Sequence, residues 1–86
     1  MSTQDPIVIV AAKRTPMGGF MGGLSAVSAT TLGATAIRGA MQAANLSNDQ
    51  VDEVIMGCVL PAGLKQAPAR QAALEADLDL STACTT

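Results

Sequence analysis

The chain has 86 residues and a formal net charge of −2, which allows one small domain at most and argues against nucleic-acid binding. Histidine is absent, so the commonest general base and the commonest metal ligand are missing from these residues. Hydrophobic side chains make up 49% of the sequence, yet Phe20 is the only aromatic residue, which predicts an incomplete domain.

The first predicted element is a strand over residues 7–12, where the run IVIVAA is typical of a strand covered by helices on both faces. The segment after it contains Pro16 and two glycine pairs between Gly18 and Gly23, and is predicted to be a loop. The glycine spacing is partly that of a Walker phosphate loop, but Leu24 stands where the lysine is required. The spacing of a dinucleotide fingerprint is also missing. The sequence therefore predicts a connector and no phosphate site.

The second predicted element is a helix over residues 30–44, in which Leu32, Ile37 and Met41 share one face. Asn45 is the predicted C-terminal stop. The glycines and alanines of this helix lower its intrinsic stability but allow another backbone to approach closely. We therefore expect a tightly packed layer.

The rest of the chain predicts a strand, a helix and a strand. A polar turn from Ser47 precedes an apolar run at residues 54–60, which is predicted to be a second strand buried on both faces. Pro68 opens a short alanine-rich helix over residues 68–78, and residues 80–86 begin a third strand. This order predicts an α/β fold with parallel or mixed strands. Two short helices cannot cover both faces of such a sheet, so we expect further cover from chain beyond Thr86 or from another subunit.

The two cysteines, Cys58 and Cys84, stand far apart without CxxC spacing, and no metal site is predicted. Both are interpreted as reduced core thiols of a cytosolic protein. Cys84 could be a nucleophile, but no histidine is present to activate it, so the structural interpretation is favoured. The N-terminus carries Asp5 where a signal peptide would be positive, and its apolar run is too short to span a bilayer. These features predict a cytoplasmic protein that does not contact membranes.

Arg70 and Gln71 lie on other faces of the second helix than its alanines. A solvated helix face is the simplest interpretation, and a site or an interface pair is the alternative. Residue chemistry alone predicts no catalytic and no cofactor-binding residue in the chain.

Five segments, read together, resemble the N-terminus of thiolases in order and spacing. They are VIVAAKRTPMGGFMGGLS, LGATAIRGAM, VDEVIMGCVLPAG, PARQAAL and CTT, and they cover nearly all of the chain. Thiolases often carry asparagine before the PARQ segment, where this sequence has Ala67. The resemblance implies a layered αβαβα fold made of two similar halves. Residues 1–86 would then be an incomplete N-terminal domain that lacks its central helix and ends just before the loop of the nucleophilic cysteine.

The thiolase resemblance also implies an enzyme. It would condense two acetyl-CoA molecules to acetoacetyl-CoA and CoA, or run the reverse thiolysis, through an acetyl-cysteine intermediate. CoA thioesters would be substrates, and no cofactor is implied. The histidine that activates the nucleophile and the second catalytic cysteine would lie in the C-terminal half. Cys84 matches neither catalytic cysteine. Residues 1–86 alone should therefore be inactive.

The small-residue helix and residues 68–73 offer a surface for close packing without aromatic side chains. We therefore expect the complete protein to be an oligomer of identical subunits, a dimer or a homotetramer, with Arg70 and Gln71 at a subunit contact near the active site. Two alternatives stay open: a 3-ketoacyl-CoA thiolase of fatty-acid β-oxidation, and a thiolase-like fragment without catalysis.

Overall fold

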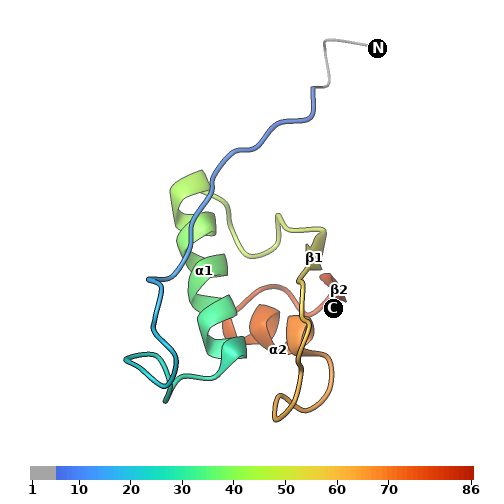
Figure 1. The fold of residues 1–86 in the computed structure, drawn as a ribbon. Helices are drawn as coiled ribbons and strands as arrows, with labels where there is room; N and C mark the ends of the chain where they lie inside the picture. The colour runs from blue at the N-terminus through green and yellow to red at the C-terminus, as the bar shows by residue number, and fades with distance from the viewer. Residues whose placement is uncertain (1–5) are drawn as a thin grey trace.

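The computed structural model describes residues 6–86, and its four elements follow one another as helix, strand, helix and strand (Figure 1). They are α1 (Ala29–Ala44), β1 (Glu53–Ile55), α2 (Pro68–Glu75) and β2 (Ala83–Thr85). The two strands pair in parallel, α2 packs against both of them, and α1 packs against α2. The expected α/β class is confirmed, but the predicted first strand is not formed.

Capping interactions determine where helix α1 begins and ends. The Ser28 hydroxyl accepts a hydrogen bond from the backbone N–H of Thr31 at 3.2 Å and caps the N-terminus. At the other end Asn45 adopts a left-handed conformation with φ 57°, and its N–H donates to the carbonyl of Gln42. Asparagine is one of the few residues that tolerates this conformation, so the predicted helix and its predicted stop are both confirmed.

Helix α2 begins with Pro68 at its first position, as predicted, but ends at Glu75, three residues earlier than expected. Asp77 has φ 63°, its N–H donates to Leu74, and the N–H of Leu78 donates to Ala73. This pair of bonds is a Schellman motif, which closes the helix and turns Leu78 into the core.

The parallel sheet pairs Glu53 with Ala83, Val54 with Cys84 and Ile55 with Thr85. Val54 is 8% exposed, whereas Ile55 is 71% exposed, so the described residues cover only one face of β1. The expectation of a strand over residues 54–60 buried on both faces is therefore wrong for this structure. Ladder bonds reach only to Met56, whose N–H donates to Thr85 at 2.9 Å, and the chain then leaves the sheet.

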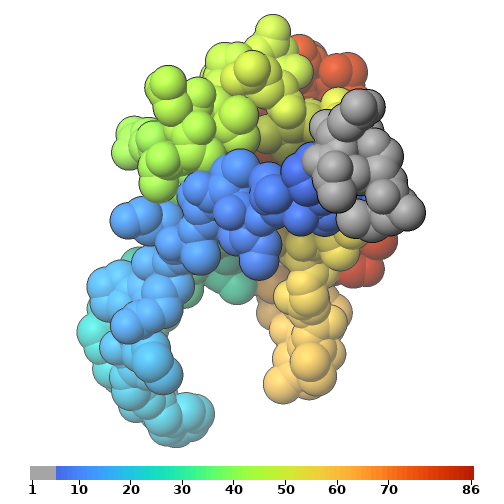
Figure 2. All heavy atoms as spheres, turned by 90° about the horizontal axis from the view of Figure 1, so that it is seen from above, coloured from blue at the N-terminus to red at the C-terminus, as the bar shows by residue number. Residues whose placement is uncertain are grey.

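Residues 7–12 run extended past α1 and form no strand with any other part of residues 6–86 (Figure 1). Figure 2 shows this segment, in blue, lying across one face of the molecule. Ile7 is 100% exposed and Ile9 is 89% exposed. The predicted strand is absent because a strand requires a hydrogen-bonding neighbour, and neither β1 nor β2 supplies one here.

The core is small and lies between the two helices and the sheet. Its buried cluster consists of Ala34, Val54, Ala73, Ala76 and Leu78. Close packing of the helices depends on Gly33, where an added Cβ would lie 3.3 Å from the Cβ of Ala72. The expected tightly packed layer is thus confirmed between α1 and α2.

Candidate functional site

The glycine segment is a chain of tight turns that is exposed to solvent. The backbone N–H groups of residues 22, 25 and 27 donate to the carbonyls of residues 19, 22 and 24, at 2.9 to 3.0 Å. A Cβ added at Gly22 would lie only 3.0 Å from the Gly19 oxygen, so this turn favours glycine. These amides are hydrogen-bonded within the turns, whereas those of a phosphate loop are directed at the phosphate. The predicted loop is confirmed.

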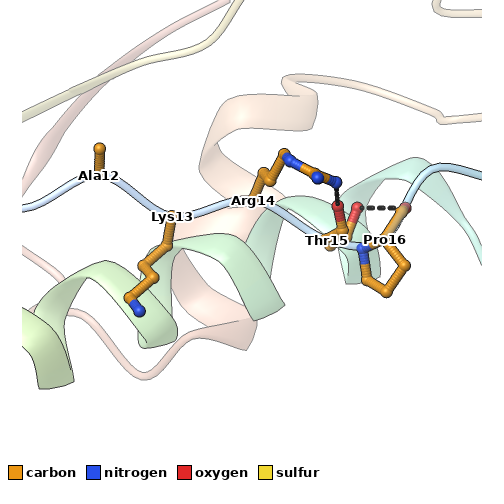
Figure 3. A pocket seen from close by; sticks show the side chains of 5 residues that line it. All are labelled: Ala12, Lys13, Arg14, Thr15 and Pro16. Atoms are coloured by element: carbon orange, nitrogen blue, oxygen red, sulfur yellow. Dashed lines mark hydrogen bonds between the residues drawn. The ribbon is translucent and has the colours of Figure 1, made fainter.

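A broad surface hollow lies just before the glycine segment, and Figure 3 shows the five residues that line it, Ala12 to Pro16. The Arg14 guanidinium donates to the Thr15 carbonyl at 3.0 Å, and the Thr15 hydroxyl donates to the Pro16 carbonyl at 3.2 Å. Lys13 and Arg14 extend in different directions. All the lining residues come from one short segment with purely local bonds, so this hollow is not a built binding site.

The edge where both strands end is a better candidate. The carboxyl ends of parallel strands meet at one edge of a sheet, and α/β proteins place their ligand sites there. The Thr86 hydroxyl, directly after β2, accepts a hydrogen bond from the N–H of Ala69 in the first turn of α2 at 3.0 Å. A small cavity of about 60 Å³ lies at this edge, between the starts of both helices and the residues that follow β1.

The entry into α2 explains why Thr86 is needed. Ala67 occupies the cap position with φ 47° and ψ 66°, and its side chain makes no capping hydrogen bond. The left-handed conformation is unfavourable for alanine, and asparagine or glycine is preferred in it. The Thr86 hydroxyl therefore satisfies an amide of the first turn that the cap residue leaves open.

Arg70 and Gln71 hold the chain on either side of α2. Arg70 donates from Nη1 to the Thr82 carbonyl at 3.0 Å and from Nη2 to the Leu80 carbonyl at 2.9 Å. Gln71 donates from Nε2 to the carbonyls of Gln66, at 2.7 Å, and of Leu64. Both side chains are half-buried, so the simplest expectation, a solvated helix face, is wrong. Their contact with a second subunit stays a prediction.

The turn before β2 is a feature that the sequence interpretation missed. The Asp79 carboxylate accepts hydrogen bonds from the backbone N–H and the hydroxyl of Ser81, each at 3.0 Å. These two bonds hold the pKa of the Asp79 carboxyl below its usual range, and the backbone bond has the larger effect. The Asp-Leu-Ser sequence is a local signal for such a turn and could have identified it.

The two cysteines differ in environment. Cys84 is half-buried on β2 and lies against the core cluster, with its thiol 3.6 Å from the Thr82 carbonyl. Cys58 is exposed at the carboxyl edge of the sheet, so its interpretation as a core thiol is wrong. Both thiols are free. Residues 6–86 contain no group of three or more side chains suited to hold a metal ion.

Arg70 and Gln71, the two residues expected near the active site, do not line the small cavity at the edge of the sheet. The structure brings Thr86 and Cys58 to the same small cavity. Arg70 is directed instead toward the turn before β2, and Gln71 toward the loop before α2. Neither helix in the described part of the chain is long and apolar enough to cross a membrane.

Comparison with known proteins shows what this arrangement is similar to. Residues 7–86 match the thiolase family in its N-terminal domain. The mitochondrial acetyl-CoA acetyltransferases of Bos taurus and Homo sapiens are each 51% identical over 84 residues, which is 98% of this chain and 20% of each relative. Acetyl-CoA acetyltransferase 2 of Arabidopsis thaliana is 54% identical over 80 residues, which is 93% of this chain and 20% of that relative. The chain thus spans about a fifth of the length of these curated relatives.

A solved structure is similar as well. The crystal structure of the Acat5 thiolase from Ascaris suum, in complex with coenzyme A, superposes with a TM-score of 0.87 at 35% identity. The likeness covers 91% of this chain and 21% of the other. It confirms that the fold is thiolase-like, with these residues forming part of the N-terminal half.

One expectation is contradicted by the relatives. The lack of a signal peptide pattern and the two free cysteines led to the prediction of a cytoplasmic protein. The cattle, human, mouse and zebrafish relatives are all mitochondrial by name. The prediction is wrong because neither a missing secretory pattern nor reduced cysteines distinguish the cytosol from a mitochondrial compartment.

Proposed function

Because the chain belongs to the thiolase family, we propose that the complete protein is an acetyl-CoA acetyltransferase. The observation that supports this most is the 51% identity, over nearly the whole chain, to relatives that carry this name. The reaction would join two acetyl-CoA molecules into acetoacetyl-CoA and release CoA, and thiolysis would be its reverse.

The proposed reaction has two half-reactions. A cysteine thiolate beyond Thr86 attacks the carbonyl carbon of acetyl-CoA, the thioester bond breaks, and CoA leaves as the thiol after taking up a proton. A base then removes a proton from the methyl group of a second acetyl-CoA, and the resulting carbanion attacks the acetyl-cysteine. Acetoacetyl-CoA forms, and the enzyme thiolate is regenerated. CoA binding is supported by the coenzyme A complex of the Ascaris suum thiolase.

The described residues would serve this reaction as a scaffold. In the proposed enzyme, the histidine, the second catalytic cysteine and most contacts to CoA come from other parts of the protein. The parallel strands β1 and β2 and the first turn of α2 would set where the chain arrives after Thr86. Cys58 and Cys84 would take no part in bond formation.

We also propose that the complete protein is an oligomer of identical subunits, a dimer or a tetramer. Within a span of six residues, Ile55, Val59 and Leu60 expose large apolar side chains, at 71%, 92% and 83%. Such surfaces are normally covered, by the rest of the chain or by another copy. Sedimentation of the complete protein should give a mass of at least two subunits, and a monomer at micromolar concentration would contradict the proposal.

The proposed activity is tested on the complete protein with a series of substrates. Acetoacetyl-CoA and longer 3-ketoacyl-CoA thioesters are offered with CoA, and the acyl-enzyme is trapped and located by peptide mass spectrometry. We expect thiolysis of acetoacetyl-CoA and an acetyl group on a cysteine outside residues 1–86. Faster turnover of long-chain substrates would identify a 3-ketoacyl-CoA thiolase instead. Absence of both turnover and acyl-enzyme would identify a thiolase-like protein without catalysis.

A further inference from the structure

The sheet formed by β1 and β2 is too short to determine its own register. Only three residue pairs are in register, from Glu53 with Ala83 to Ile55 with Thr85. A slip of one residue would turn every side chain of a strand to the opposite face, and the few ladder bonds resist such a slip weakly. Another part of the molecule must therefore hold β2 in place.

The turn before β2 is held from two directions. From one side, the Thr82 hydroxyl donates to the Val51 carbonyl at 3.2 Å, and the Asp79 N–H donates to the Asn48 carbonyl at 3.3 Å. From the other side, the Arg70 guanidinium donates to the carbonyls of Leu80 and Thr82. The bonds to residues 48 and 51 join the turn to the segment before β1, and those of Arg70 join it to α2.

Arg70 is suited to this task by its shape. The guanidinium is planar and directs several N–H donors in a fixed fork, so two carbonyls two residues apart can be bound at once. One residue earlier in α2, the N–H of Ala69 donates to the Thr86 hydroxyl at 3.0 Å. The first turns of α2 thus hold β2 just before its first residue and just after its last.

We propose that Arg70 is a positioning residue, which sets the register of β2 and thereby places the chain that follows Thr86. The inference rests on the proposed function in one respect: the reactive cysteine is expected in that following chain. Arg70 touches no substrate in this role and acts only through the carbonyls of Leu80 and Thr82. Loss of its two bonds would let β2 shift and would misplace the thiol relative to acetyl-CoA.

The test compares Arg70→Met and Arg70→Lys with a matched control, Arg38→Met, in the complete protein. Arg38 also donates to a backbone carbonyl, that of Glu75 at 2.7 Å, but at the other end of α2 and away from β2. The rate of acetylation of the enzyme by acetyl-CoA is measured in a single turnover. We expect Arg70→Met to slow it by about a hundredfold, the effect of a misplacement near 1 Å, with little change in the Kd of CoA. Arg38→Met should stay within about twofold of the wild type, as expected of an exposed surface change.

Arg70→Lys distinguishes positioning from simple stability. Lysine keeps the charge but cannot bind both carbonyls in the same fixed geometry, so it should recover only part of the lost rate. If Arg70→Met does not fold, the acetylation rate of Arg70→Lys alone tests the proposal. Equal rates for Arg70→Lys and the wild type, or equal rates for the Arg70 and Arg38 variants, would overturn the proposal.

Hydrogen exchange separates this inference from the proposed function. In the wild type the N–H groups of Met56 and Ala83 are bonded across the sheet region, to Thr85 and Asp52. These amides should exchange at least about tenfold faster in the Arg70 variants, while the amides in the middle of α1 keep their wild-type rates. A wild-type protein without acetyl transfer would refute the function alone, whereas unchanged exchange at β2 would refute the role of Arg70.

Discussion

At the scale of single residues, Ala67 has a side chain that is poorly suited to its backbone conformation. It has φ 47° at the start of α2. An L-residue in this left-handed region is disfavoured by about 1–2 kcal/mol, and asparagine less so. We expect Ala67→Asn to raise the unfolding free energy of the complete protein by about 1 kcal/mol, measured by denaturant titration.

The control for this change is the same substitution in an ordinary helical position. Ala43 is exposed within α1, where asparagine is less favourable than alanine by about 0.7 kcal/mol. Ala43→Asn should therefore destabilise the protein while Ala67→Asn stabilises it. Destabilisation by both substitutions would show that Ala67 is not strained in the protein.

Cys84 provides a second prediction at this scale. It is half-buried, and its thiol contacts the carbonyl of Thr82 at 3.6 Å. Replacing a structural thiol alters packing by roughly 1 kcal/mol, whereas removing a nucleophile lowers the rate by several powers of ten. Cys84→Ser should keep acetyl transfer by the complete protein within about tenfold of the wild type. A folded variant with a loss of many thousandfold would identify Cys84 as catalytic.

At the scale of elements, alanine substitutions at two glycines of α1 are expected to differ in their effect on stability. An added Cβ at Gly33 would lie 3.1 Å from Met56 Cε and 3.3 Å from Ala72 Cβ, whereas at Gly39 the nearest atoms belong to Lys13 at 3.7 Å. Gly39→Ala should stabilise the complete protein by about 1 kcal/mol, the ordinary gain within a helix. Gly33→Ala should fail to give this gain, because it pushes α1 away from α2. Equal gains in thermal unfolding experiments would mean that the helices are not in close contact at Gly33.

The elements that could be predicted from sequence are those that local signals specify. Pro68 and Asn45 mark helix ends through their own backbone preferences, and both helices were found with at most small errors at their ends. A strand depends on a neighbour, so residues 7–12 read as a strand but have no partner among the described residues. The role of Arg70 could not be predicted either, because its acceptors lie ten and twelve residues further along the chain.

At the scale of the whole molecule, the chain exposes more surface than a folded domain of its mass. Its accessible surface is 6563 Å² for 8.6 kDa, whereas a compact monomer of this mass exposes about 4,700 Å². The radius of gyration is 14.4 Å, against about 12 Å for a compact chain of 86 residues. Figure 2 shows the reason: the glycine segment and the loop after β1 project from the body as two arms.

This excess surface bears on the stability of a polypeptide that consists of these 86 residues alone. No large side chain among the described residues is fully buried, and the core is mostly alanine. Ordering a residue costs roughly 1.5 kcal/mol of conformational entropy, which so small a core cannot offset. The polypeptide should therefore be unfolded or aggregated, and circular dichroism should show no cooperative thermal transition. It should also fail to thiolyse acetoacetyl-CoA, because it contains no histidine to activate a thiol. A cooperative transition would contradict the first expectation, and turnover above background would place the chemistry within residues 1–86.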